Sequence, residues 1–196
     1  MEHLPADAGR ILLLIARQSI ARALGKSSPP ATTVPAPWLQ SLAATFVTLR
    51  QGDRMRGRTG SLKPQRSLHD DVIENAIRAA LHDPCFSPLK LAELDDTSIE
   101  VAVLSEFEAV AVEDERAALA QLRPGIDGAM FRYGYHHSNF LPEMWGQYPD
   151  PREFLAHLKY KAGVPPDFWD ARVELQRYNI SHWQEGTGKP DFDKNQ

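Results

Sequence analysis

A short row of arginines is the stretch of this sequence whose residue types and spacing best suit chemistry. Residues 54–60 read Arg-Met-Arg-Gly-Arg-Thr-Gly and follow a Gln-Gly-Asp turn. Residues two apart in an extended strand share a face, so we expect Arg54, Arg56 and Arg58 to point the same way. Cations on one face repel one another unless they are solvated or face anions. The row therefore predicts either a solvated edge strand or an anion-binding site.

The anion need not belong to a substrate, because the charges of this chain are unevenly spread. Residues 50–66 hold six Lys or Arg and one acid, whereas residues 91–115 hold nine Asp or Glu and no Lys or Arg. Arg56 and Arg58 could each make a bidentate contact with a carboxylate or phosphate. The bound anion could be a substrate or one of the nine acids. The uneven spread of charge is explained equally well by two solvated surfaces of opposite sign.

Cysteine and histidine supply the other reactive candidates. Cys85 is the single cysteine, so an intrachain disulfide and a cysteine-rich zinc site are excluded. As a nucleophile it would need a base such as His82, His136 or His137, and nothing in the sequence brings these together. The adjacent His136 and His137 would point to opposite faces of a strand and could not share one metal ion. We predict no metal site and favour a buried, inert thiol at Cys85, and we keep Cys85 and His137 as the candidates if the protein is catalytic.

The composition describes an ordinary globular chain. Its 196 residues, with 42% hydrophobic and 24% charged residues, suit one domain with a proper core. A net charge of −4 argues against general nucleic-acid binding. No Walker A, GxSxG or dinucleotide fingerprint is present, so no cofactor is predicted. The longest aliphatic run is too short to span a membrane, and the N-terminus lacks a signal-peptide pattern, so we expect a cytoplasmic protein.

The pattern of apolar residues predicts the elements that position these side chains. We expect helices over residues 7–25, 38–43, 67–83, 115–122 and 151–163, and strands over residues 44–49, 54–60, 99–103, 129–133, 135–140 and 172–180. The proline-rich segment 27–37 is expected to be a loop, and the polar segment 185–196 a disordered tail. Most neighbouring strands lie too close together for helical crossovers. An α+β fold with an antiparallel sheet flanked by helices therefore fits best.

Several ordered segments resemble the AMMECR family, whose prokaryotic members are called AmmeMemoRadiSam system protein A. The resemblance covers residues 11–178. The family's Phe-Val-Thr-Leu strand is intact at residues 46–49, and its Leu-Arg-Gly-Cys-Ile-Gly hexapeptide corresponds to Met55, Arg56, Gly57, Arg58, Thr59 and Gly60. Residues 83–89 match the family's Asp-Pro-Arg-Phe-Pro-Pro segment, and residues 140–142 with Trp145 and residues 161–163 match two further segments.

The resemblance implies a single domain over residues 1–184 with two unequal lobes, or subdomains, and a cleft that the hexapeptide strand faces. It also implies work beside a Memo-type protein and a radical SAM enzyme. The family has no established activity. Two functions are open: a component that binds or modifies a sizeable substrate in the cleft, and a non-catalytic interaction partner or adaptor. Whether the protein is an enzyme is left open between them.

The chain departs from the family pattern at two positions. Arg58 stands where the hexapeptide has cysteine, and Cys85 stands where the family has the arginine after Asp-Pro. Our hypothesis is that these two positions are spatial neighbours that exchanged side chains. If the side chains touch, Arg58 would lower the pKa of the Cys85 thiol and make its thiolate more available.

Overall fold

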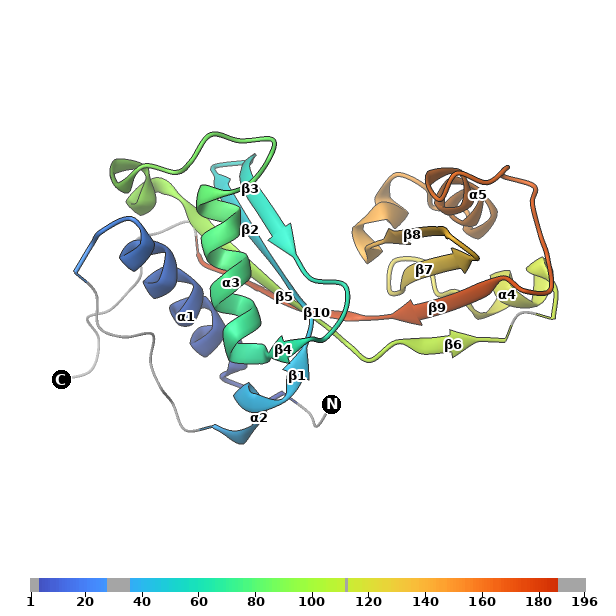
Figure 1. Ribbon diagram of the computed structural model, residues 1–196, viewed down its shortest axis with the longest axis horizontal. Helices are drawn as coiled ribbons and strands as arrows, with labels where there is room; N and C mark the ends of the chain where they lie inside the picture. Colours follow the sequence, from blue (N-terminus) through green and yellow to red (C-terminus); the bar gives the residue numbers. More distant parts are fainter. Residues whose placement is uncertain (1–3, 28–35, 112, 187–196) are drawn as a thin grey trace. The chain divides into compact units, whose positions relative to one another are not determined.

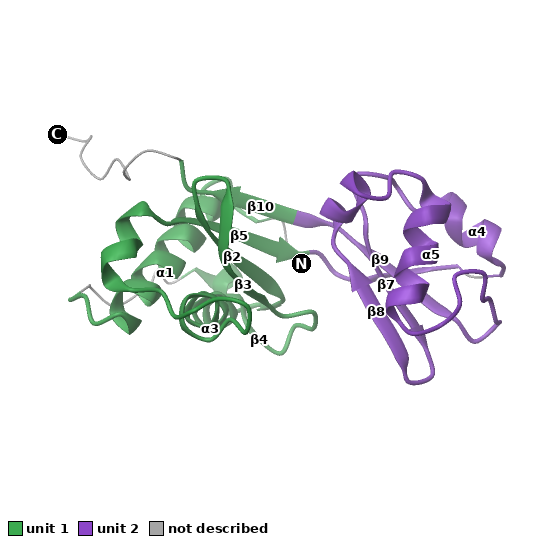
Figure 2. Ribbon diagram, turned by 90° about the horizontal axis from the view of Figure 1, so that it is seen from above, with its two compact units in different colours: residues 1–104, 181–196 green, residues 105–180 purple. Residues whose placement is uncertain are grey.

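The chain divides into two compact units, each with its own hydrophobic core. The computed structural model describes residues 4–27, 36–111 and 113–186. Unit 1 comprises residues 1–104 and 181–196, and unit 2 comprises residues 105–180 (Figure 2). Unit 2 is thus inserted between two strands of unit 1, and the two units are described separately below.

Unit 1 is built on a four-stranded sheet in the order β10-β5-β2-β3. Its strands are β2 (Thr45–Gln51), β3 (Arg54–Gly60), β5 (Ser98–Leu104) and β10 (Ile180–Gln184). The register of β2 with β3 and with β5 is antiparallel. The helices α1 (Ala8–Ala23) and α3 (Leu68–Leu81) cover one face of this sheet (Figure 1). Smaller elements complete the unit: α2 (Pro37–Gln40), the 3-10 helix η1 (Leu91–Asp96), and the two-stranded sheet of β1 (Leu42–Ala43) with β4 (Arg66–Ser67).

Local sequence explains where the two long helices begin and end. The Ser67 hydroxyl accepts the Asp70 N–H at 3.2 Å, and Asp70 and Asp71 lie in the first turn of α3, where the helix dipole favours acids. Asp7 precedes α1 but makes no side-chain cap bond. Gly25 has φ +84°, which is the left-handed conformation that ends helices at glycine.

Unit 2 is a second antiparallel sheet, in the order β6-β9-β7-β8. Its strands are β6 (Glu108–Val110), β7 (Gly128–Tyr133), β8 (His136–Phe140) and β9 (Glu174–Tyr178), and its helices are α4 (Glu115–Gln121), the 3-10 helix η2 (Pro142–Gly146) and α5 (Pro151–Lys161). The Asp150 carboxylate accepts the Arg152 N–H at 2.7 Å, and Pro151 occupies the first turn of α5. The Trp145 ring stacks on Phe154 with ring centroids 3.8 Å apart, at the centre of the core.

The α+β class with antiparallel sheets flanked by helices is confirmed, and most predicted elements are present. In place of the single sheet that we expected, the described residues form two four-stranded sheets and one two-stranded sheet. The expected helix over 38–43 ends at Gln40 and is followed by β1. The strand β10 was not predicted. Most of the proline-rich loop lies outside the described residues. No helix in the described part of the chain is long and apolar enough to cross a membrane.

Candidate functional site

A β-bulge interrupts the hexapeptide strand at Arg56. Leu49 of β2 pairs with Gly57 of β3, but the next residue, Arg50, pairs with Met55. Arg56 is therefore the extra residue that opposes no partner of its own. An extra residue breaks the two-residue alternation of a strand and redirects its side chains.

Because of this bulge, the predicted row of arginines on one face is wrong. The Arg56 guanidinium reaches Glu93, which also accepts a hydrogen bond from Gln51 at 3.3 Å. The guanidinium carbon of Arg58 instead lies 5.6 Å from the centroid of the Phe46 ring. The two arginines serve different neighbours and do not form one anion-binding row.

The anion that Arg56 holds is an internal one. Its Nε and Nη2 lie 3.1 and 3.3 Å from the two carboxylate oxygens of Glu93, and its Nη1 and Nη2 donate to the carbonyls of Ser87 (2.8 Å) and Pro88 (3.4 Å). Only 14% of the Arg56 side chain is exposed. The hydrogen bond from Arg56, followed by that from the Lys90 N–H, lowers the pKa of Glu93 to about 2. Glu93, one of the nine acids, is therefore the anion that Arg56 binds, in place of a substrate.

The rest of the acidic stretch does not form a separate acidic surface either. Its members are spread over both units, and several pair with cations distant in the sequence. These pairs are Lys26–Asp95, Arg50–Glu100, Arg177–Glu108 and Lys159–Glu115. With Glu93 included, five of the nine acids are thus paired with a cation of their own unit.

The two hexapeptide glycines each pack closely against a different neighbour. A Cβ at Gly57 would lie 2.2 Å from the main-chain oxygen of Ala79, so glycine lets α3 pack directly on β3. A Cβ at Gly60 would lie 2.2 Å from the ring of Phe46, which is the ring beneath Arg58. Both glycines therefore allow a close approach that a larger residue would block.

Asp83 joins the two positions at which this chain departs from the family pattern. One oxygen of its carboxylate accepts the Arg58 N–H at 2.7 Å, and the other accepts the Cys85 N–H at 2.8 Å. The main-chain N–H groups of Arg58 and Cys85 are therefore held by one carboxylate, and contact between the two side chains stays a prediction. The Cys85 residue is exposed, which corrects the alternative of a buried thiol.

A buried aspartate anchors the end of the hexapeptide strand. Asp71 is 1% exposed and accepts hydrogen bonds from the Thr45 N–H and hydroxyl, the Ser61 hydroxyl and the Asn75 amide, all within 3.0 Å. It also pairs with Arg66 at 3.3 Å. This network ties the start of β2 and the end of β3 to α3, so the position of the hexapeptide follows from the helix.

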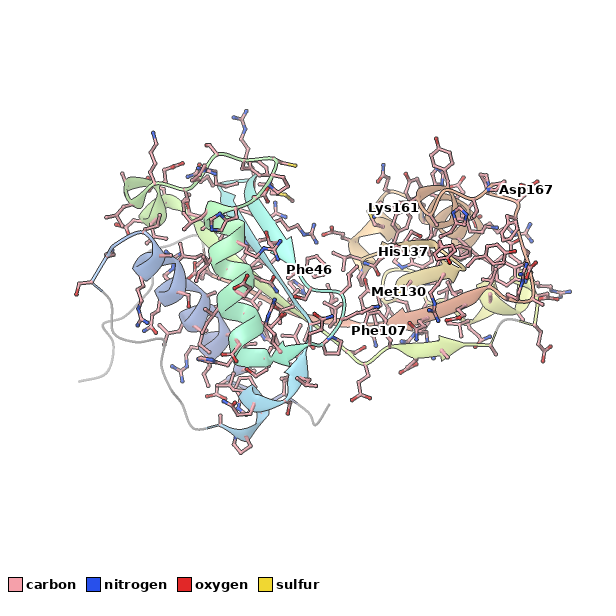
Figure 3. The ribbon with its side chains drawn as sticks, in the orientation of Figure 1. Phe46, Phe107, Met130, His137, Lys161 and Asp167 are labelled. Carbon is pink, nitrogen blue, oxygen red and sulfur yellow. The ribbon has the colours of Figure 1, made fainter. Side chains whose placement is uncertain are left out.

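Of the candidate bases, His82 is the C-cap of α3 in unit 1, three residues before Cys85 in the chain, whereas His136 and His137 belong to unit 2. His137 is on β8 of unit 2, opposite Arg132, and is labelled in Figure 3, whereas Cys85 belongs to unit 1. His136 points to the other face, where its Nδ1 lies 3.0 Å from the Ala162 carbonyl. The prediction that the pair cannot share an ion is consistent with this geometry. Among the described residues, no group of three or more His, Cys, Asp or Glu could hold a metal ion.

Sequence reasoning missed Asp83 and Glu93 as the residues that organise this site. Asp83 had a detectable signal, because an Asp-Pro pair favours a turn in which the Asp side chain binds the main-chain N–H two residues later. Glu93 had none beyond being one of nine acids. Its pairing with Arg56 spans 37 residues and depends on the tertiary fold.

Comparison with known proteins gives consistent matches along nearly the whole chain. The AMMECR1 family model matches residues 13–183. A protein from Methanothermobacter thermautotrophicus is 36% identical over 188 residues, covering 93% of this chain and 96% of its own length. The crystal structure of the uncharacterized protein PH0010 from Pyrococcus horikoshii is similar, with a TM-score of 0.78 at 31% identity over 90% of this chain and 91% of that one. The family suggested by the ordered segments is thereby confirmed: the chain belongs to the AMMECR1 family.

Proposed function

We propose that this protein is a binding component that works beside a Memo-type protein and a radical SAM enzyme. In this proposal the Cys85 loop, residues 83–88, is the surface offered to one of these partners. The observation that carries the proposal is that this loop is largely exposed and yet tightly held. The family resemblance supplies the class of partner, and the geometry of the loop supplies the surface.

The Cys85 loop is fixed to β3 from both sides. Asp83 reaches from the loop to the Arg58 N–H, and Arg56 reaches from the strand to the carbonyls of Ser87 and Pro88. The Leu89 N–H then donates to the Ala80 carbonyl at 2.7 Å and closes the loop on the end of α3. Two prolines within the loop restrict its backbone further. A loop ordered before binding loses less conformational entropy when a partner docks on it.

Cleft-based chemistry on a sizeable substrate is the second candidate function. The specific observation in its favour is the exposed Cys85 thiol on a fixed loop. A thiol is the only strong nucleophile that the loop carries, and a reactive thiol must be accessible. In this second candidate function, Cys85 is the reactive residue. The cleft that would hold the substrate remains a prediction.

Binding to purified partners tests the proposal and separates the two candidates. We would immobilise this protein and measure the affinity of the Memo-type protein and the radical SAM enzyme encoded in the same genome. Asp83→Ala removes the acceptor for two main-chain N–H groups, and we expect it to weaken binding about tenfold. The matched control is Asp167→Ala, at an exposed aspartate of unit 2 (Figure 3).

Cys85→Ser completes the experiment. If the loop only binds, this variant keeps both its affinity and the function of the system. If Cys85 reacts, it keeps the affinity and loses the function. The proposal fails if neither candidate partner binds the wild-type protein, or if Asp83→Ala binds as tightly as Asp167→Ala.

A further inference from the structure

The strand β10 forms one edge of the unit 1 sheet and leaves a row of main-chain groups unpaired by any described strand (Figure 2). The Glu185 N–H donates to the Ile99 carbonyl at 3.0 Å, and the Ser105 N–H donates to the Asn179 carbonyl at 2.8 Å. In this segment, the main-chain N–H and C=O groups of the odd-numbered residues therefore point toward β5. Main-chain groups alternate sides along a strand, so those that point outward belong to Ile180, His182 and Gln184.

The other sheet edges carry the protections that proteins use against unwanted pairing. On β3, the Arg58 N–H is already bound by Asp83. On β8, Lys161 Nζ donates to the Asn139 carbonyl at 2.9 Å. The strand β6 is three residues long and includes Glu108. The strand β10 reads Ile-Ser-His-Trp-Gln, with no Lys, Arg, Asp, Glu or Pro, and it shares this with β8, whose edge differs in being contacted by Lys161.

The side chains that face inward hold β10 in place. A Cβ at Gly9 of α1 would lie 2.2 Å from the Trp183 ring, so the ring rests directly on that helix. Glu185, which was expected to begin a disordered tail, accepts the Arg17 Nε–H at 2.6 Å and the Ile99 N–H at 2.9 Å. Because the strand is anchored from its inner face, its outer edge is already in a conformation that can accept another strand.

We propose that β10 pairs with β10 of a second copy of this chain, antiparallel, with the two His182 residues opposite each other at a twofold axis. In an antiparallel pair centred on residue 182, His182 faces His182 and Ile180 faces Gln184, so the pairing brings no like charges together. The uncharged β10 thus avoids like-charge repulsion, whereas β3, with three arginines, would not. Pairing would extend the four-stranded sheet through both copies. A five-residue edge is a small interface, so we expect a weak dimer, with a dissociation constant of roughly micromolar order.

Sedimentation velocity over a series of protein concentrations tests this proposal. We expect the wild type to shift from monomer to dimer as the concentration rises. His182→Pro removes an outward N–H, which the strand's own ladder does not use, and should raise the dissociation constant about tenfold or more. His182→Lys places two cations opposite each other and should also weaken the dimer. His182→Thr is the control and should dimerise like the wild type, because the pairing uses the main chain.

Amide exchange identifies the surface used. The His182 N–H should exchange more slowly at concentrations where the dimer forms, and thermal melts of all variants should match the wild type. The proposal is overturned if the wild type remains a monomer, or if His182→Pro dimerises normally, since another surface would then be responsible. Slow exchange of the His182 N–H only when a different protein is bound would also overturn it, because the occupant would not be a second copy.

Discussion

Replacing Gly57 with alanine tests the closest approach in the hexapeptide strand. The added Cβ would lie 2.2 Å from the Ala79 carbonyl oxygen and 3.2 Å from its carbonyl carbon. These atoms are helix backbone, and Ala76, Ala79 and Ala80 are buried, so the clash can be relieved only by shifting the packed backbone and not by turning a side chain. Overpacking of this kind costs at most about 3 kcal/mol in most cores. Alanine in place of glycine returns about 0.5–1 kcal/mol of chain entropy.

The net effect is a loss of about 2 kcal/mol in the free energy of unfolding. For a chain of this size that corresponds to a fall of about 4–8 °C in Tm, measured by calorimetry. Gly60→Ala meets the Phe46 ring, which can rotate, so we expect only about 1 kcal/mol. Gly146→Ala is the matched control, since nothing lies within 4 Å of its added Cβ, and it should stay within about 0.5 kcal/mol of the wild type.

A double-mutant cycle with Ala79→Gly shows whether the clash is with backbone. The contact is with the Ala79 carbonyl, so deleting the Ala79 side chain should relieve nothing and the coupling energy should be close to zero. Recovery of stability in the double variant would refute this reasoning. So would a Gly57→Ala protein that melts at the wild-type temperature.

Three further predictions concern the ion pairs and the Cys85 loop. The folded-state pKa of Glu93 is about 2 against an ordinary 4.5, so its stabilisation is present above pH 4.5 and is lost as the pH falls toward 2; Glu93→Gln should flatten this acid limb in urea midpoints. Lys159 is fully buried while the Glu115 side chain is 33% exposed, so Glu115→Ala leaves a buried ammonium without its counter-charge, though still bound to the Phe168 carbonyl, and should cost about 3 kcal/mol in urea unfolding. Lys159→Met keeps the apolar volume and should cost less than about 1.5 kcal/mol, and equal costs would contradict this. Asp83→Ala should speed exchange of the two amides that it binds at least tenfold, without a comparable change in the amides of α1.

Local sequence determined the elements of this fold and its family. Helix boundaries depend on residues within one turn of each end, and the Ser67 cap and the left-handed Gly25 are such signals. The hairpin of β7 and β8 follows from alternation on both sides of Gly134, where φ is +57°. The ordered family segments are equally local, because each is a short run of letters.

Local patterns failed at β10 and at the bulge. Polar residues alternate with Ile180 and Trp183 too irregularly to predict a strand, and β10 is defined instead by its contacts with β5 and α1. The Arg56 bulge is a property of the register between two strands, so no reading of β3 alone reveals it. A single inserted residue was enough to separate the arginines that alternation had placed together.

The sequence by itself therefore determined most of the helices and strands, though not β10, and the short segments that identify the family. Only the tertiary structure decided which charges meet. Arg56 and Glu93 are 37 residues apart, and Asp83 joins Arg58 to Cys85 across a helix and a loop. Such pairings depend on how the chain closes its loops around a core, and no periodicity of two or 3.6 residues encodes that choice.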